Sequence, residues 1–507
     1  GVISKNMEFV HNFVSTMPEK EVMEKTFVKL GISLEIRKEQ EILGRSEEKV
    51  ASGGMTSGAK QDAKHGYKIF YAETRPDKKI TVADFAGSFR SRYSQIQRML
   101  MGRGELANLV SINKISSDRA GFSIIGIVIE KRLSKNGNLI IKFEDLTGAI
   151  NGVVKADRGE VFEKAKELQL DDVVGVKASG GREGLVFVHD IIYPDAHVAE
   201  KVKFDDDICV AFLSDFHTGS DRHLEQSVEK FLEWINSDHE TARKVKYIFI
   251  VGDNVDGVGI YPAQEKLLKI KSMKGQYEKL AYYLRKIPKH ITMFMCPGQH
   301  DAVRVAEPQP IIGKRYGAPL YEIENLVLVT NPTLVKLSEG SKEFKVLMYH
   351  GASIHTFINE IDELREMKAH HCPAKAVRHM LKRRHLSPTH SSVVYIPYID
   401  YDPLVITEVP DILCTGEVHK MDVETYNGAI IITGSCWQAQ TPFEEKVGNE
   451  PDPAKVPVFN LKTRELKVFD FGVEEEINRD YNAKPTAVEV KKEEVKAEIA
   501  GVPGAGK

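Results

Sequence analysis

The sequence predicts a multidomain α/β protein in which a small β-barrel precedes a larger domain of sheets flanked by helices. Its 507 residues are enough for about three domains, and 42% of them are apolar, which is enough to form a buried core. Short strands dominate the region between about 106 and 194, whereas apolar strands alternate with helical stretches between 205 and 473. The first pattern is typical of a barrel and the second of an α/β sheet.

Composition restricts the class of function. The 70 Lys and Arg residues are balanced by 73 Asp and Glu residues, so the net charge is −3 and any nucleic-acid site has to be a local patch. None of the 5 cysteines lies in a Cys-x-x-Cys pair, which predicts a reduced environment and argues against a cysteine-based zinc site. No apolar run approaches the ~18 residues of a membrane span, and the N-terminus lacks the pattern of a signal peptide. We therefore expect a cytoplasmic protein without membrane contact.

The first 83 residues carry no assignable chemistry, and their fold is not evident. We predict a helix near 19–31 and a flexible link over 51–63, where small residues dominate. Because the chain begins with Gly1 rather than Met, we expect an upstream segment to be missing. A basic amphipathic helix is predicted over 84–104, with Asp84 as its cap and apolar residues at helical spacing. This helix serves either in packing or as a phosphate contact.

A five-stranded barrel is predicted over 105–200. The expected strands are 122–131, 139–144, 149–155, 173–178 and 185–192, with a short helix at 160–169 before the fourth strand. This order is typical of a Greek-key barrel of the oligonucleotide-binding type. Phe122, Phe143 and Phe187 are the only rings that could stack on bases, so a structural or partner-docking barrel is favoured over nucleic-acid contact.

The domain predicted over 201–475 contains five polar motifs, each after an apolar strand. They are Asp215-x-His217, Gly252-Asp253, Gly298-Gln299-His300-Asp301, His350-Gly351 and Gly416-Glu417-x-His419. Sites of α/β sheets form where the strands end, so these carboxylate, amide and imidazole groups are expected to converge. The mixed set of oxygen and nitrogen donors suits two adjacent Mn, Fe or Zn ions, with Mg also possible. Isolated structural histidines would not be expected to recur after strands beside Gly and Asp.

The ordered motifs resemble those of the calcineurin-like metallophosphoesterases. More narrowly, the preceding barrel and the segments 381–389 and 403–411 are similar to the small subunits of archaeal family-D DNA polymerases. The resemblance covers roughly 84–473. It implies a calcineurin-like domain that hydrolyses DNA phosphodiesters with two metal ions. It further implies a proofreading 3′→5′ exonuclease that acts on single-stranded or mismatched 3′ ends and binds a large polymerising subunit, in a heterodimer or a larger assembly.

The resemblance also implies a role for each matching residue. One metal would be held by Asp215, His217, Asp253 and His419. The second would share Asp253 and add Gln299, His350 and Glu417, while His300, oriented by its acidic neighbour Asp301, would act in catalysis. The superfamily commonly has Asn at the position of Gln299 and His at that of Glu417. We therefore expect an altered second-metal site rather than an inactive one.

Two charged segments lie around the last motifs. A basic run over 365–390 includes Arg378, Lys382, Arg383 and Arg384, which we interpret either as DNA phosphate contacts or as a solvated helix face. The final segment, 476–507, is rich in Lys and Glu and nearly free of aromatic residues, which predicts a disordered charged tail.

Two other functions are compatible with these patterns. The chain can be a non-catalytic scaffold subunit of a replicative polymerase, as in related eukaryotic subunits that have lost ligands; the Asp and His residues retained here argue against complete loss. It can also be a free-standing phosphomonoesterase, but the barrel and the basic run would then have no evident use.

Overall fold

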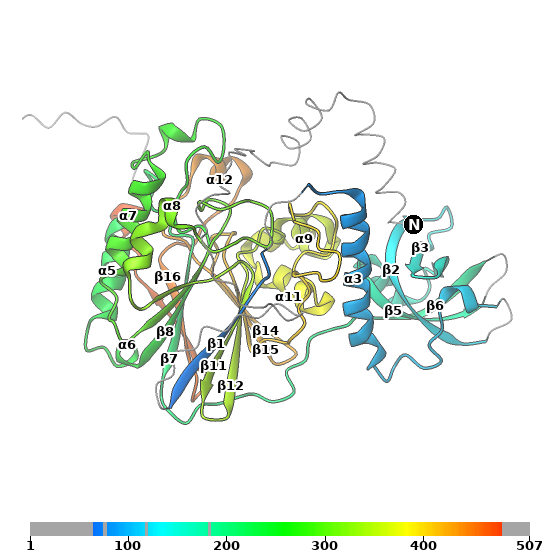
Figure 1. Ribbon diagram of the computed structural model, residues 1–507. Helices are drawn as coiled ribbons and strands as arrows, with labels where there is room; N and C mark the ends of the chain where they lie inside the picture. The colour runs from blue at the N-terminus through cyan, green and yellow to red at the C-terminus, as the bar shows by residue number, and fades with distance from the viewer. Residues whose placement is uncertain (1–63, 75–78, 117–119, 181–183, 479–507) are drawn as a thin grey trace, which may run out of the picture.

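The computed structural model describes residues 64–74, 79–116, 120–180 and 184–478. In this part of the chain two six-stranded sheets form one body, and a closed barrel lies beside it (Figure 1). The helix predicted near 19–31, the link over 51–63 and most of the tail predicted over 476–507 lie outside the described residues. Within the described ranges, no helix is both long and apolar enough to cross a membrane.

The first sheet joins strands from distant parts of the chain. Its order is β1 (His65–Tyr71), β11 (Thr333–Glu339), β12 (Lys342–Met348), β13 (Ile412–Thr415), β15 (Ala429–Thr433) and β14 (Asp422–Tyr426). β12, β13 and β15 are parallel to one another, whereas β1, β11 and β14 are antiparallel to their neighbours. The carboxyl ends of β12 and β13 therefore lie at the same edge of the sheet.

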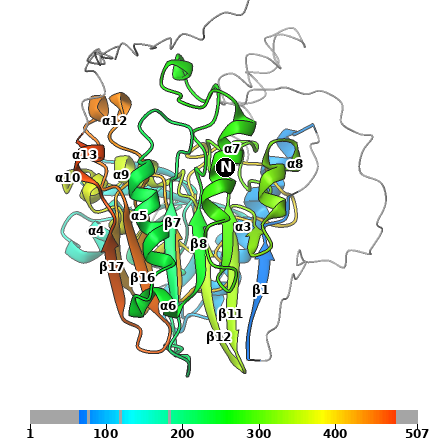
Figure 2. The same cartoon turned by 90° about the vertical axis from the view of Figure 1, so that its left-hand side faces the viewer.

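The second sheet has a parallel centre. Its order is β10 (Leu326–Leu328), β9 (Thr292–Cys296), β8 (Val245–Val251), β7 (Cys209–Ser214), β16 (Lys455–Asn460) and β17 (Leu466–Asp470). Figure 2 shows β8, β7, β16 and β17 in this order across the body. β7, β8 and β9 are parallel and buried on both faces, which explains why their sequences are nearly continuous apolar runs.

Helices cover the outer face of each sheet, and the inner faces meet in an aromatic core. α5 (Glu225–Ile235) and α7 (Met273–Leu284) pack on the second sheet, and α9 (Ile354–Glu360) and α11 (Ala374–Arg383) on the first. Between the sheets, the ring of Phe249 stacks on those of Phe212 and Phe294. Side chains alternate along a strand, so Phe212 faces this inner core and Leu213 faces the helices.

The remaining short elements connect these layers. They are α4 (Gly159–Lys166), α6 (Glu240–Lys244), α8 (Lys314–Gly317), α10 (Asp362–Glu366), α12 (Pro442–Val447), α13 (Glu474–Ile477) and the 3₁₀ turns η1 (Ile112–Lys114), η2 (Gln264–Lys266), η3 (Ala318–Glu322) and η4 (Ala369–His371).

The sequence did not predict β1. This strand forms the edge of the first sheet, where it pairs antiparallel with β11 over seven residues. Its signal is weak because a single apolar residue, Ile69, is fully covered, and Tyr67 and Tyr71 are half-buried beside it. The segment before residue 83 thus contributes directly to the body that carries the polar motifs.

The amphipathic helix is present as α3 (Val82–Met101), and it lies between the barrel and the body (Figure 1). Its cap is Thr81 rather than Asp84: Thr81 and Asp84 form a reciprocal capping box, in which the Thr81 backbone N–H donates to Asp84 Oδ2 at 2.8 Å. Phe89 and Tyr93 pack on the barrel. Arg92 is not solvated, since it is 2% exposed and ion-paired with Asp402 at 2.7 Å.

The predicted barrel is confirmed as a closed five-stranded barrel. Its order is β2 (Phe122–Leu133), β3 (Leu139–Asp145), β4 (Gly148–Val154), β6 (Leu185–Ile192) and β5 (Val173–Gly180), and α4 lies between β4 and β5 in the sequence. Phe122 and Phe143 fill its interior, and Phe187 alone of the three predicted rings is exposed. Two of the three rings therefore cannot stack on bases.

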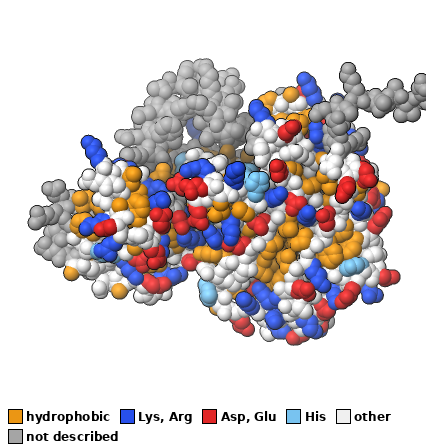
Figure 3. Space-filling model, turned by 180° about the vertical axis from the view of Figure 1, so that it is seen from behind, with side chains coloured by type: hydrophobic (Ala, Val, Ile, Leu, Met, Phe, Trp, Pro, Cys, Tyr) orange, Lys and Arg blue, Asp and Glu red, His pale blue; other side chains and the backbone are white. Residues whose placement is uncertain are grey.

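The basic run holds the barrel to the body and does not form the expected phosphate track. Arg383 is 3% exposed and pairs with the buried carboxylate of Asp172 at 2.9 Å. Lys382 pairs with Glu167 of the barrel region, and Arg378 pairs with Glu424 at 3.3 Å. The guanidinium of Arg384 donates to the carbonyls of residues 195, 406 and 407. Seen from behind, basic and acidic side chains intermingle where the barrel meets the body (Figure 3).

Candidate metal centre

The five polar motifs meet because their strands are parallel. Asp215 follows β7, Asp253 follows β8 and the Gln299-His300 pair follows β9 of the second sheet. His350 follows β12 and Glu417 follows β13 of the first sheet. The two sheets face each other, so the loops after all five strands gather at one end of the body.

Five of the seven predicted ligands have left-handed backbone conformations. The φ angles of Asp215, His217, Asp253, Glu417 and His419 are 50°, 44°, 44°, 73° and 57°. Such conformations cost on the order of 1–3 kcal/mol each for residues other than glycine and persist where the surroundings impose them. Their concentration in these loops is typical of a functional site.

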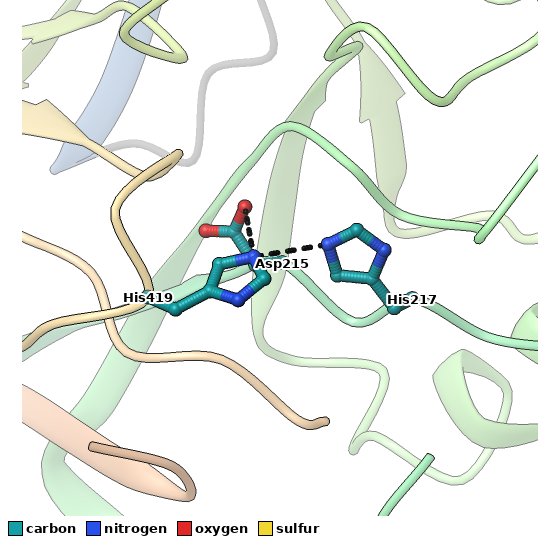
Figure 4. Close-up of side chains that lie close together, drawn as sticks. All are labelled: Asp215, His217 and His419. Carbon is teal, nitrogen blue, oxygen red and sulfur yellow. Dashed lines mark hydrogen bonds and ion pairs between the residues drawn. The ribbon is translucent and has the colours of Figure 1, made fainter. Parts of the chain in front are cut away.

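Asp215, His217 and His419 form the first cluster (Figure 4). The Nε2 atoms of His217 and His419 lie 3.0 Å apart, and His419 Nε2 lies 3.5 Å from Asp215 Oδ1. All three side chains are buried. Their ligand atoms are close enough to contact one cation.

Asp215, Asp253 and His350 form a second cluster beside the first. His350 Nε2 lies 3.3 Å from Asp253 Oδ2 and 3.9 Å from Asp215 Oδ1. Glu417 Oε2 lies 3.3 Å from the same nitrogen. The expectation was that Asp253 alone is shared between the two metal positions. Asp215 belongs to both clusters, and Asp253 reaches the first through a 3.9 Å approach to His217 Nε2.

The protonation of the imidazoles follows from their partners. His350 and His300 each place Nδ1 against a backbone carbonyl, at 3.1 and 2.7 Å, and a carbonyl only accepts hydrogen bonds. His217 and His419 each place Nδ1 against a carboxylate, that of Asp256 at 3.1 Å and that of Glu444 at 2.9 Å. Each Nδ1 therefore carries the hydrogen, and each neutral ring turns the electron pair of Nε2 toward the carboxylates of the site.

This arrangement fits a bound cation. Electron pairs of imidazoles and carboxylate oxygens converge, and they repel one another unless a positive charge lies between them. Among the described residues, Asp215 Oδ2 and Gln299 Oε1 are buried without a hydrogen-bond partner. Burial opposes ionisation of Asp253, but the neighbouring His350 and His300 lower its pKa below the ordinary value. Burial likewise opposes the charge of His350, and Asp253 nevertheless raises its pKa.

His300 lies in the site as expected, but Asp301 does not orient it. The His300 backbone N–H donates to Asp253 Oδ1 at 2.9 Å, and its Nε2 lies 3.9 Å from Asp253 Oδ2. The Asp301 carboxylate instead accepts hydrogen bonds from Gly298, Asn254 and Tyr277. Burial raises the pKa of Asp301 to about 6. Asp301 therefore joins two loops, and its expected direct role in catalysis is not supported by its position.

Three residues that hold the predicted ligands were not identified from the sequence. Asp256 and Glu444 accept from the imidazoles of His217 and His419, and Asn331 accepts from the backbone N–H of His350 at 2.9 Å. Asp256 lies three residues after Asp253, so a second acidic residue in that motif was an available signal. Glu444 and Asn331 are distant in sequence from the motifs and carry no such signal.

Glycine is required beside the ligands. A Cβ atom at Gly298 would lie 2.2 Å from Asp253 Oδ1, and one at Gly252 would lie 2.1 Å from His350 Nδ1. A Cβ atom at Gly416 would lie 2.4 Å from Asp215 Oδ2. The glycines of the motifs thus allow the loops to approach the clustered side chains closely.

Replacing Asp256 with Asn is expected to weaken Mn²⁺ binding by roughly 10–100-fold, the usual effect of removing a group that orients a histidine ligand. Asp256 accepts from His217 Nδ1, from Gln264 and from Gln438, so an amide NH₂ at this position would face a donor. Isothermal titration calorimetry with Mn²⁺ measures the change. Asp157→Asn, an exposed position in the barrel region, is the matched control. Unchanged affinity in Asp256→Asn would contradict the assignment.

Glu307 is expected to make stability depend on pH. It is 2% exposed, and burial raises its pKa from 4.5 to about 8, although the Tyr349 hydroxyl donates to it at 3.2 Å. Between these pH values the native state binds a proton that the unfolded state has lost. The free energy of unfolding should therefore fall as pH rises from about 4.5 to about 8, by at most ~1.4 kcal/mol per pH unit.

Urea unfolding of Glu307→Gln across this range tests the effect, because the variant cannot titrate there. The variant should lose less stability than the parent as pH rises, while Glu278→Gln on the exposed face of α7 should follow the parent. Parallel profiles for Glu307→Gln and the parent would show that Glu307 is ionised in the native state.

The part of the chain that carries this centre is similar to known components of DNA polymerases. The family model for the B-type subunit of DNA polymerases alpha and epsilon matches residues 210–423. The DNA polymerase II small subunit of Pyrococcus abyssi is 38% identical over 403 residues, which is 77% of this chain and 64% of that protein. The corresponding protein of Methanothermobacter thermautotrophicus is 36% identical over 395 residues, covering 76% of this chain and 80% of the relative.

The chain therefore belongs to the family of archaeal DNA polymerase II small subunits. It spans about 64% of the length of the Pyrococcus abyssi relative. Among solved structures, an archaeal phosphodiesterase aligns with 52% of this chain and 99% of its own at 12% identity, with a TM-score of 0.26, which is too low to support an argument.

Proposed function

We propose that the chain is a metal-dependent 3′→5′ exonuclease subunit of a DNA polymerase that removes mismatched or single-stranded 3′ nucleotides. The observation that carries this proposal is the convergence of imidazole Nε2 atoms on the carboxylates of Asp215 and Asp253. Two facing sheets flanked by helices, with the polar loops at the strand ends, support a calcineurin-like metallophosphoesterase domain over 201–475. The barrel over 105–200 and α3 would form a separate unit attached to it.

In this proposal, two divalent cations would be held by the residues of the two clusters. Asp215, His217, Asp253 and His419 would hold the first ion, and Asp253, Gln299, His350 and Glu417 would surround the second. When bound, such ions supply Lewis acidity toward the phosphate and lower the pKa of water. The donor set admits Mn, Fe, Zn or Mg ions.

His300 would serve the reaction directly. Its Nδ1–H is anchored on the carbonyl of residue 256, so its Nε2 is the atom that faces the site. Asp253 raises the pKa of His300, although burial lowers it. A protonated His300 would donate the Nε2 hydrogen to the phosphate oxygen or to the leaving 3′ oxygen of the shortened strand. Asp301 would position the loop that carries it.

The partner would be a large polymerising subunit, as family membership suggests. The DNA substrate would be the 3′ end that such a subunit has extended. Because Arg383 and Arg384 are engaged within the chain, the contacts to the strand would come from elsewhere, including the residues around the mouth of the site.

A non-catalytic scaffold subunit is the second candidate function. The observation that favours it is the position of Glu417, whose carboxylate leaves His350 as the only imidazole of the second cluster. A scaffold would retain the fold and the large interface between barrel and body but would not need metal.

Nucleotide release decides between the two candidates. The purified chain, alone and with the large subunit, is incubated with a 3′-labelled single strand and with a mismatched primer in the presence of Mn²⁺. The nuclease proposal requires nucleotide release that is lost in Asp215→Ala and His217→Ala. Absence of release from every preparation would leave the scaffold, and faster turnover of a small aryl phosphate than of DNA would indicate a phosphomonoesterase.

A further inference from the structure

Gln299 and Glu417 contact each other in the second cluster. Gln299 Nε2 donates to Glu417 Oε2 at 2.7 Å. A carboxylate only accepts hydrogen bonds, so the nitrogen end of the amide has to be the end that faces Glu417. The other end, Gln299 Oε1, is buried and has no hydrogen-bond partner among the described residues. The contact thus determines which end of the amide points away from Glu417.

His355 holds the other oxygen of the same carboxylate. It lies on α9, a few residues after His350, and its Nε2 is 3.7 Å from Glu417 Oε1. The His355 side chain is 42% exposed, whereas that of Glu417 is 18% exposed, so His355 lies at the solvent border of the site. The ring of His370 packs beside His355, with centroids 5.5 Å apart. Glu417 is therefore held at Oε1 by His355 and at Oε2 by Gln299.

We infer that Glu417 and His355 are positioning residues that orient the amide of Gln299 so that its oxygen, not its nitrogen, faces the second cation. The inference rests on the metal site proposed above. An amide nitrogen has no electron pair to offer a metal, so a freely rotating Gln299 would present a ligand only part of the time. Held by Glu417, the amide adds a neutral oxygen donor to the carboxylate of Asp253 and the imidazole of His350.

The consequence is a preference among metals. Oxygen-rich donor sets suit Mn²⁺ and Mg²⁺, whereas sets dominated by imidazole and thiolate suit Zn²⁺. With the amide oriented, oxygen donors outnumber nitrogen at the second position. Loss of Glu417 or His355 should therefore weaken Mn²⁺ at that position and leave the first position, built on His217 and His419, unchanged.

A double-mutant cycle on Mn²⁺ binding tests the inference. Titration calorimetry and electron paramagnetic resonance on the full chain measure both Mn²⁺ equivalents in the parent, Glu417→Ala, Gln299→Leu and the double variant. Glu417→Ala and Gln299→Leu are each expected to weaken the second equivalent by roughly 10–100-fold, the range for groups that orient ligands. The double variant is expected to resemble Gln299→Leu alone, because Glu417 acts through the amide.

His355→Ala should weaken only the second equivalent, and His371→Ala, an exposed histidine on the neighbouring segment, should change neither. An unchanged first equivalent in each variant shows that the variant is folded. Additive losses in the cycle would make Glu417 an independent ligand and overturn the inference while the metal site stands. Failure of the parent to bind Mn²⁺ at all would instead remove the proposed metal site.

Discussion

Replacing Asp253 with Asn is expected to abolish exonuclease activity and to weaken both Mn²⁺ equivalents. One carboxylate oxygen of Asp253 lies 3.3 Å from His350 Nε2 and 3.9 Å from the Nε2 atoms of His217 and His300. An amide keeps the size of the side chain but removes the charge that faces three imidazoles. We expect nucleotide release to fall on the order of 10³-fold, or about 4 kcal/mol of transition-state stabilisation.

The measurement pairs nucleotide release from a labelled single strand with Mn²⁺ titration of the same preparations. Asp238→Asn, at an exposed position before α6, should match the parent in both assays. Retention of Mn²⁺ affinity and of release in Asp253→Asn would rule out these clusters as the catalytic metal centre. If the parent has no activity to lose but binds Mn²⁺ through Asp253, the ions have a structural role in a scaffold.

Replacing Arg383 with Ala is expected to cost about 3–5 kcal/mol of the free energy of unfolding. The guanidinium is 3% exposed, donates to both oxygens of Asp172 and reaches the carbonyl of Glu167 at 2.6 Å. Asp172 is equally buried, and burial raises its pKa while Arg383 opposes that rise. Without Arg383, the Asp172 carboxylate would remain in the interior without a counter-charge, and the barrel would lose its main attachment to α11.

Urea unfolding measures this loss, and Arg378→Ala is the matched control on the same helix. Arg378 is more exposed and pairs with Glu424 at 3.3 Å, so its removal should cost no more than about 1 kcal/mol. The double variant Arg383→Met with Asp172→Asn should recover part of the stability, because no uncompensated charge remains. A drop in DNA affinity with unchanged stability in Arg383→Ala would reinstate the phosphate track.

Much of the candidate site was predictable because it depends on local patterns. The apolar strands that end at Ser214, Val251, Cys296, Met348 and Thr415 are evident from composition, and the polar residues follow them directly. Parallel pairing then brings these residues to one edge, which the alternation of strands and helices already indicates. The barrel was predictable for the same reason, since its strands are short, alternating and separated by turns.

The partners of charged residues were not predictable in this way. The basic pattern of 365–390 is the same whether its side chains contact phosphates, solvent or carboxylates of a neighbouring unit. Asp172, which neutralises Arg383, lies 211 positions away in the sequence. Similarly, Asp301 follows His300 directly, yet its carboxylate turns toward Asn254 and Tyr277, because the loop conformation, not sequence adjacency, sets its direction.

By itself, the sequence determined the types of donor groups, their order and their positions after buried strands, because strand periodicity is a property of neighbouring residues. Only the tertiary structure decided which of these groups touch. It brought His217 within 3.0 Å of His419 across 202 positions, included Asp215 in both clusters and turned the nitrogen of Gln299 toward Glu417. Such contacts depend on how two sheets face each other, and no short stretch of sequence carries that information.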